Sequence, residues 1–257
     1  MSGFAGIIQL DKKPVGAPLV EKLTRRTERH GGDAFSIHCD RNFGLGHSLL
    51  RTSKESANET QPFSLDGNVW ITGDVRIDAR EELIDALNDK GEKGHAAQAD
   101  IELVAHAYRT WGEECPHHLL GDFAFAAWNE QKQRLFCARD SFGIKPFYYA
   151  RLGSLFVFSN DIASILDHPA FTDELNESAI ADYLAFGYNL DEKTTCFSNL
   201  QRLPPSHVLT LSADSTPRFT RYTRLVFDQR IKYQNDEEYA EQFLDLFKQA
   251  VKDRLRT

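Results

Sequence analysis

The alternation of short strand-like segments with pairs of helix-like segments constrains the fold of this chain more than any other feature. Period-two patterns and short apolar runs bounded by turn residues predict strands at Phe4–Leu10, Phe35–Cys39, Gly44–Leu50, Val69–Thr72, Asp122–Asn129, Arg134–Ala138, Pro146–Ala150, Leu155–Ser159, Val208–Leu211 and Phe219–Arg221. Helical spacing predicts helices at Leu19–Arg29, Ala79–Leu87, Asp100–Trp111, Ile162–Leu166 and Glu177–Phe186. Strand runs framed by helix pairs indicate a layered domain of mixed helix and sheet, with two sheets inside and helices outside.

Helix and loop signals complete this pattern. Asp78 is the predicted N-cap of the second helix, and Asp100 opens the third. The segment Asp89–Gln98 contains two glycines and several charges, which predicts a mobile loop.

The C-terminal part of the chain has a different composition. Asp228–Asn235 is polar and strongly charged, as in a linker, and Asp236 caps a final predicted helix. Its apolar residues recur every four positions and form one stripe: Tyr239, Phe243, Phe247, Val251 and Leu255. Such an apolar stripe is stable only when another part of the protein or a partner packs against it. Either the helix folds back on its own domain, or it is the first helix of a further domain that is absent from this chain.

Composition narrows the possible partners. The formal charge is −8 and no Lys/Arg block occurs, which argues against nucleic acid and anionic membranes. No apolar stretch has the length of a membrane span, and the N-terminal apolar run lacks the basic flank of a signal peptide. The four cysteines and the histidines lack metal-ligand spacing, so we expect no metal site and buried free thiols in a cytoplasmic, reducing environment.

Ser2 is the first candidate for chemistry. Removal of Met1 would leave Ser2 with a free α-amine, which titrates near neutrality and can act as the base for its own hydroxyl. Small Gly3 and the apolar run after it would place this terminus at the start of a buried strand. The plain alternative is that a Met-Ser start has no catalytic meaning.

Further motifs follow in a fixed order. They are Leu45-Gly46-His47, Gln61-Pro62, Ile71-Thr72-Gly73-Asp74 at a predicted strand end, Ala99-Asp100-Ile101-Glu102 at a predicted helix start, Gly121–Ala126 and Arg139–Tyr149. In this order they resemble the class II glutamine amidotransferase domain of asparagine synthetases. The resemblance implies an N-terminal-nucleophile hydrolase of the α+β class with a four-layer αββα fold.

The resemblance also divides the chain. Residues 1–225 would form the amidotransferase-like domain and residues 226–235 a linker. Residues 236–257 are similar to the helix that leads into the family's ATP-pyrophosphatase synthetase domain.

The nucleophile and the carboxylate clamp of the family are both replaced. The family has a Cys at the position of Ser2, and its thiol attacks the glutamine side-chain amide with the α-amine as base. A Ser keeps the geometry but lacks the thiol's nucleophilicity. Leu49 stands where the family has the Arg that clamps the substrate α-carboxylate, and a Leu makes no ion pair. Arg51 shares a strand face with that position but is out of register by one pair.

The implied substrate-binding residues are Thr72, Gly73, Asp74 and Asp100. The family's Asn-Gly-Glu stretch is here Thr72-Gly73-Asp74, so the backbone donor of the oxyanion hole is kept and an amide donor becomes a hydroxyl. Asp100 matches the family's Asp that receives the substrate α-amine. The family's Arg-Gly-Pro-Asp loop is altered to the sequence at 30–33, His-Gly-Gly-Asp.

These residues also have structural explanations. Asp100 is equally suited to cap a helix, and Gly73 to allow a tight turn at a strand end. Arg139 and Asp140 would form a structural ion pair, and Lys145 would pack against a sheet edge.

Several functions are compatible with this pattern. The family's ATP-binding Ser-Gly-Gly-Leu-Asp-Ser loop does not occur, so the chain itself has no cofactor, and ATP with Mg²⁺ is implied only for a synthetase domain in cis or in trans. The favoured reading is the structural half of an amide-forming ligase, resembling the lasso-cyclase and β-lactam-synthetase branch, in which the Cys is lost. The alternatives are an active Ser hydrolase, a fragment of a genuine asparagine synthetase, and a stand-alone binding module. The apolar stripe additionally predicts a homodimer.

Overall fold

The computed structural model describes residues 1–92, 98–212, 216–224, 226 and 230–256. Part of the loop predicted to be mobile (93–97) and part of the predicted linker (227–229) therefore lie outside the described residues.

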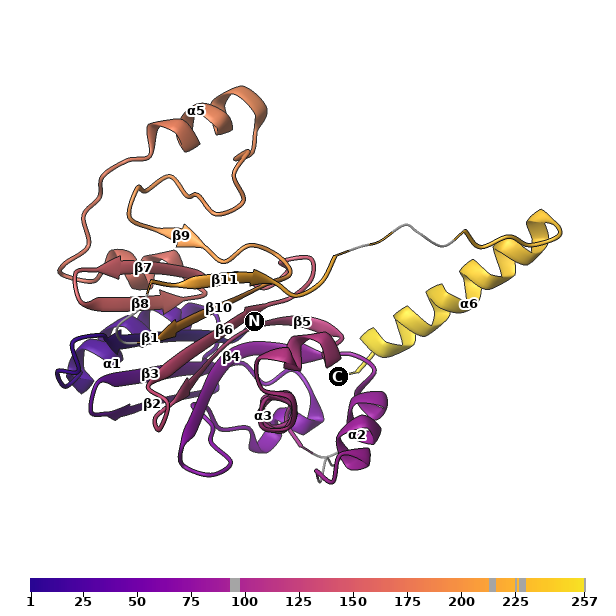
Figure 1. Ribbon diagram of the computed structural model, residues 1–257, viewed down its shortest axis with the longest axis horizontal. Coiled ribbons are helices and arrows are strands. Elements are labelled where there is room, and N and C mark those ends of the chain that lie inside the picture. The colour runs from indigo at the N-terminus through magenta and orange to yellow at the C-terminus, as the bar shows by residue number, and fades with distance from the viewer. Residues whose placement is uncertain (93–97, 213–215, 225, 227–229, 257) are drawn as a thin grey trace.

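Two antiparallel sheets form the centre of the described structure (Figure 1). The first has the order β2-β3-β1-β8-β7-β9. Its strands are β1 (Gly3–Gln9), β2 (Ala34–Asp40), β3 (Phe43–Leu49), β7 (Tyr148–Leu152), β8 (Leu155–Ser159) and β9 (Gln201–Arg202). The second has the order β11-β10-β6-β5-β4. Its strands are β4 (Val69–Ile77), β5 (Gly121–Asn129), β6 (Arg134–Arg139), β10 (His207–Ser212) and β11 (Arg218–Arg221).

Helices cover the outer face of each sheet. The α-helices are α1 (Ala17–Arg25), α2 (Arg80–Asp89), α3 (Asp100–Trp111), α4 (Ile162–Leu166), α5 (Glu177–Phe186) and α6 (Asp236–Arg254). The 3₁₀ turns are η1 (Arg26–Arg29), η2 (Lys54–Asn58) and η3 (Gly112–His118). Helices α1 and α4 pack on the first sheet, while α2 and α3 lie against the second.

Three hydrophobic clusters show how the layers are held together. One lies between the sheets and contains Phe4 and Trp128. The second joins α2 and α3 to the second sheet, and the third joins α1 and α4 to the first. Alternation makes this possible: along β5, Phe123 and Phe125 face the helices while Ala124 faces the other sheet. The predicted four-layer αββα arrangement is therefore confirmed.

Strand β4 is longer than predicted. The prediction that it ends at Thr72 is wrong, because β4 pairs with β5 from Val69 opposite Asn129 to Ile77 opposite Gly121. The Thr72-Gly73-Asp74 motif thus lies within a strand. Gly73 serves close packing there and makes no turn, since a Cβ at this position would lie 2.5 Å from the Cβ of Phe125.

The predicted cap of α2 is wrong. Ala79, with a φ of 47°, precedes α2 without a side-chain cap, and the carboxylate of Asp78 instead pairs with Arg254 and Arg76. The prediction that α3 begins at Asp100 and runs to Trp111 is confirmed, but Ala99 is its N-cap and the Asp100 side chain does not cap it, so that alternative is excluded. Both carboxylates are therefore available for contacts with other parts of the chain.

Helices α5 and α6 lie away from the layered body (Figure 1). No residue of α6 is buried. Within the described chain, no helix combines the length and apolar character that crossing a membrane requires. All four cysteines are free, but only Cys115 and Cys137 are buried; Cys39 is half-buried and Cys196 is exposed.

Candidate functional site

A cavity of about 230 Å³ lies where β1 begins and β3 ends, beside the middle of β4. Its lining includes Ser2, Gly73, Asp74 and Asp100. The structure thus gathers most of the predicted site residues from separate elements. A larger cavity of about 390 Å³, between the edge of β4 and α3, contains none of them. We therefore take the smaller, more polar cavity as the candidate site.

Ser2 is held by three hydrogen bonds. Its main-chain nitrogen donates to Asp74 Oδ1 at 3.2 Å, and its carbonyl oxygen accepts from Asn160 Nδ2 at 2.8 Å. Its Oγ accepts from the main-chain nitrogen of Leu50 at 3.0 Å. The side chain is 8% exposed, so it is oriented toward the cavity and not free in solvent.

Asp74 connects Ser2 to a lysine. Its second oxygen, Oδ2, lies 2.8 Å from Lys145 Nζ, and both side chains are largely buried. Lys145 reaches this position because the Asp140 carboxylate holds its loop. Asp140 accepts hydrogen bonds from the main chain of Phe142, Ile144 and Lys145. The prediction that Lys145 packs against a sheet edge is therefore wrong, since its ammonium group lines the cavity.

The predicted oxyanion donors are engaged elsewhere. The main-chain nitrogen of Gly73 donates to Gln61 Oε1 at 2.8 Å. The hydroxyl of Thr72 donates to the Gly46 carbonyl at 3.3 Å, and Thr72 is not among the cavity-lining residues. The Gly73 carbonyl contacts His47 Nε2 at 3.1 Å, and burial lowers the pKa of His47 to about 3. His47 is therefore neutral near pH 7 and supports β4 instead of carrying a charge to the cavity.

Gln61 also contacts a carboxyl group in the lining. Its Nε2 donates to Glu59 Oε1 at 2.7 Å. Burial raises the pKa of Glu59 to about 7, and the nearby charges of Asp100 and Asp74 act in the same direction. Glu59 is thus a group that changes protonation near neutral pH inside the cavity.

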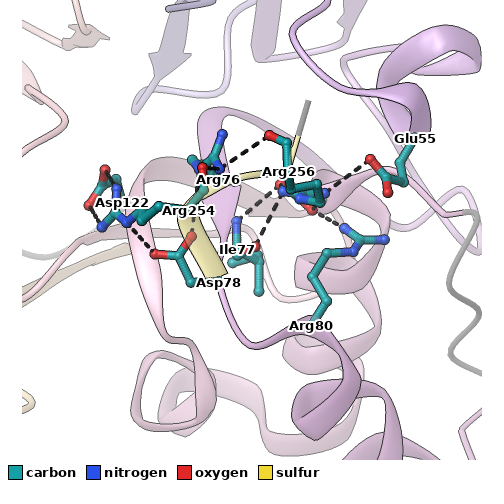
Figure 2. A network of polar contacts seen from close by, with 9 residues as sticks. Glu55, Arg76, Ile77, Asp78, Arg80, Asp122, Arg254 and Arg256 are labelled. Atoms are coloured by element: carbon teal, nitrogen blue, oxygen red, sulfur yellow. Dashed lines mark hydrogen bonds and ion pairs between the residues drawn. The ribbon is translucent and has the colours of Figure 1, made fainter. Parts of the chain in front are cut away.

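Asp100 is surrounded by hydrogen-bond donors from Ile77, Arg80 and Arg256, which are labelled in Figure 2. Its carboxylate accepts from Arg80, from the main-chain nitrogen of Ile77 at 3.0 Å, and from both terminal nitrogens of Arg256. Arg256 also lines the cavity. It comes from the segment just after α6, more than a hundred residues away along the chain.

The position of the replaced clamp offers no cation to the cavity. Leu49 is 2% exposed and lies outside the lining. The guanidinium of Arg51 donates to the carbonyls of Ala57 and Asp33, each at 3.2 Å, so it is directed to the neighbouring loop. The Lys and Arg side chains of the lining are Lys145, Arg76 and Arg256, and each has a carboxylate partner.

Sequence reasoning missed Glu59, Lys145 and Arg256 as site residues. Glu59 stands two residues before the Gln61-Pro62 motif, and Lys145 lies inside the Arg139–Tyr149 motif, so proximity to these motifs was an available signal. No sequence signal pointed to Arg256, because its contacts with the cavity depend on the position that the C-terminal end of α6 takes against the two sheets.

The arrangement suits a small polar ligand. Hydroxyl, carboxyl, ammonium and guanidinium groups converge on a cavity below the ~300 Å³ at which sites for drug-sized molecules begin. A buried Ser with an adjacent carboxylate and lysine is compatible with acyl transfer, provided that an oxyanion donor becomes free.

Comparison with known proteins gives the chain a family and homologues. The profile of the glutamine amidotransferase domain family matches residues 1–223. Asparagine synthetase [glutamine-hydrolyzing] 3 of Bacillus subtilis (strain 168) is 29% identical over 217 residues, covering 83% of this chain and 35% of the relative. Asparagine synthetase [glutamine-hydrolyzing] 2 of the same organism is 29% identical over 233 residues, covering 86% and 30%. The chain thus spans about a third of the length of these curated relatives.

A solved structure shares the fold. The glutamine phosphoribosylpyrophosphate amidotransferase of B. subtilis, complexed with ADP and GMP, superposes with a TM-score of 0.61 at 14% identity. The match covers 87% of this chain and 50% of that one, so it supports the arrangement of layers and nothing finer.

Proposed function

Since the chain belongs to the glutamine amidotransferase domain family and is homologous to asparagine synthetases, we propose that it is an amidotransferase-like domain with an impaired glutaminase site, serving as the structural half of an ATP-dependent amide-forming ligase. The observation that carries this proposal is that every Lys and Arg side chain lining the cavity is already paired with a carboxylate. A bound amino-acid carboxylate would need a dedicated guanidinium, and Leu49 supplies none.

The surroundings of Ser2 support the same proposal. Once Met1 is removed, the Ser2 nitrogen becomes an α-amine 3.2 Å from the Asp74 carboxylate. A neighbouring negative charge favours the protonated amine, which is a poor base. The Gly73 N–H is already bound to Gln61, so an oxyanion would have to compete for it. Nucleophile activation and oxyanion stabilisation are both weakened.

The partner proposed for this function is the ATP-dependent half, because the relatives are much longer than the segment that matches this chain. In this proposal the ATP-dependent half, with its Mg²⁺, acts in cis or in trans and covers the apolar stripe of α6. The loss of the Cys suggests the lasso-cyclase and β-lactam-synthetase branch, and residues 74–78, Asp-Val-Arg-Ile-Asp, resemble the lasso-cyclase branch more than the ordinary synthetases. The cysteine content suggests a cytoplasmic location.

An active Ser amidohydrolase is the second candidate. It is favoured by one observation: Ser2 Oγ accepts its hydrogen bond from Leu50, which leaves its own proton free to be transferred. A binding module and a genuine asparagine synthetase fragment have no comparable support in the cavity.

Ammonia release from millimolar L-glutamine tests the proposal. We expect the wild-type rate to equal that of Ser2→Ala. Ser2→Cys alone should gain little, because the substrate carboxylate stays unpaired. Ser2→Cys with Leu49→Arg should exceed the sum of the single variants, as coupled site residues do. Leu120→Arg, at an exposed position outside the cavity, is the control for the added charge.

A wild-type turnover of about one per second, a common value for enzymes, would overturn the proposal if Ser2→Ala abolished it. That result would establish the Ser amidohydrolase instead.

A further inference from the structure

The end of α6 returns to the body of the molecule beside the cavity. Figure 1 shows α6 as an arm whose C-terminal end lies near the second sheet and whose opposite end lies far from it. Since none of the residues of α6 is buried, packing does not hold this arm in place. Its described attachment is polar and is drawn in Figure 2.

Arg254 provides the first anchor. Its guanidinium lies 2.8 Å from Asp78 Oδ2 and donates to both oxygens of Asp122, at 2.5 and 2.9 Å. Arg76 strengthens this anchor by donating to the Arg254 carbonyl at 2.7 Å. The ion pairs of Arg254 lie outside the cavity, because Arg254, Asp78 and Asp122 do not line it, whereas Arg76 does.

Arg256 provides the second anchor, and this one lies in the cavity. It donates to Asp100 Oδ1 at 3.1 Å and to Oδ2 at 2.5 Å, a bidentate pair, and also to Glu55 Oε2 at 3.3 Å. Its side chain is only 17% exposed. Bidentate guanidinium–carboxylate pairs are among the stronger polar contacts in proteins.

The Asp100 carboxylate has no acceptor capacity left. A carboxylate offers about four lone-pair positions. Oδ1 accepts from Arg80 and Arg256, and Oδ2 accepts from the main chain of Ile77 and from Arg256. An ammonium group that enters the cavity can bind Asp100 only by displacing one of these donors. Ile77 is fixed in β4 and Arg80 in α2, whereas Arg256 follows α6, a helix with no buried residue.

We propose that Arg256 is an internal competitor for the cavity, so that binding of a ligand with an ammonium group and docking of the end of α6 exclude each other. By linkage, any interaction that holds α6 against the body lowers the affinity of the cavity for such a ligand. Binding of the ligand in turn weakens the docking of α6 by the same free energy. This goes beyond the proposed function and holds whether or not Ser2 hydrolyses glutamine.

Two probes that differ in a single group test this competition. L-Glutamine has an α-ammonium group, and glutaramic acid is the same molecule without it. Dissociation constants are measured by calorimetry in the Ser2→Ala background, so that turnover cannot interfere. Arg256→Ala should tighten L-glutamine binding by about 5- to 150-fold, the usual range of coupling between sites, and leave glutaramic acid unchanged. Lys248→Ala, which removes an exposed charge of α6 whose described ion pair is to Asp245, should change neither.

Hydrogen exchange provides a second measurement. L-Glutamine should speed amide exchange at residues 250–256 of the Ser2→Ala protein, whereas glutaramic acid should not. In Arg256→Ala the exchange should already be fast without ligand.

The proposal is overturned if the Arg256→Ala change leaves the affinity for L-glutamine unchanged or changes the affinities for both probes equally. It is equally overturned if the Arg256→Ala protein binds neither probe. It is also overturned if L-glutamine binds without changing exchange at the end of α6. None of these results depends on ammonia release, so failure here is distinct from failure of the proposed function.

Discussion

Gln61 lies between two cavity residues and hydrogen-bonds both the carboxyl group of Glu59 and the main-chain nitrogen of Gly73. It is 3% exposed, accepts from the Gly73 nitrogen at 2.8 Å, and donates to Glu59 at 2.7 Å. A buried amide that satisfies both of its neighbours is expensive to rearrange, because each broken contact would leave a buried polar group unpaired. The occupied oxyanion position is therefore a property of this three-residue chain, and not of Gly73 alone.

Glu59→Gln should change how stability depends on pH. The pKa of Glu59 is about 7 in the folded chain, above its ordinary value of about 4.3, so the folded state binds more protons between these limits. This group therefore lowers stability as the pH rises through that window, and the loss is complete above it. Gln keeps the acceptor for Gln61 without the charge. We expect it to raise stability at pH 8 by on the order of 1–3 kcal/mol and to have little effect at pH 4.5.

Urea unfolding at both pH values measures this effect. His47 changes stability with pH in the opposite direction to Glu59. The pKa of His47 is about 3 in the folded chain, so below pH ~6.5 the unfolded chain binds a proton that the folded chain does not, and stability falls as the pH falls. Stability of Glu59→Gln should therefore rise with pH between 5 and 7. Glu241→Gln, on the exposed surface of α6, is the matched control. Equal stability gains for both variants at pH 8 would remove the special role of Glu59.

At the scale of elements, α6 is the feature least explained by this chain alone. The predicted stripe is exposed along its whole length: Tyr239 is 42%, Phe243 69%, Phe247 55%, Val251 40% and Leu255 70% exposed. The rings of Phe243 and Phe247 stack with centroids 6.2 Å apart, which presents one apolar surface. The sequence offered two explanations for the stripe, a helix folded back on its own domain or the first helix of a further domain. The exposed stripe does not agree with the first of them.

We predict that the 257-residue chain self-associates through this stripe, because exposed apolar patches drive association. Replacing Phe243 and Phe247 by Gln should make the protein more monomeric while Arg254 and Arg256 keep their contacts. Deleting residues 235–257 should do the same without unfolding the layered body. Light scattering across a concentration series measures both, and thermal unfolding checks the fold. A wild-type protein that is monomeric at every concentration would contradict the prediction.

For the molecule as a whole, the lengths of the relatives matter most. They are about three times longer than the matched segment, and the chain contains no loop like the family's ATP-binding Ser-Gly-Gly-Leu-Asp-Ser sequence. We predict that the 257-residue chain shows no saturable binding of Mg-ATP, because its sequence contains no glycine-rich phosphate-binding motif. Calorimetry is the measurement, and a micromolar dissociation constant would show that another part of the chain binds nucleotide.

The sequence by itself determined the layered architecture and the family. Hydrophobic periodicity is a local property, so alternation along β5 and the four-residue spacing in α6 could be interpreted without knowing what packs against them. The replacements at Ser2 and Leu49 were equally visible, because they lie at fixed offsets within motifs. Helix and strand ends were less well predicted, as β4 shows: its continuation past Thr72 depends on pairing with β5.

Only the tertiary structure decided which charges meet in the cavity. Lys145 reaches Asp74 and Arg256 reaches Asp100 because strand ends, a fixed loop and the returning end of α6 converge at one place. Such pairs are separated widely along the chain, and their formation depends on register and side-chain direction, which no sequence period encodes. The same reason explains why Asp78, predicted as a helix cap, and Asp100, for which a cap was one alternative, bind arginines instead. A local cap and a distant guanidinium compete for one carboxylate, and the three-dimensional arrangement selects the partner.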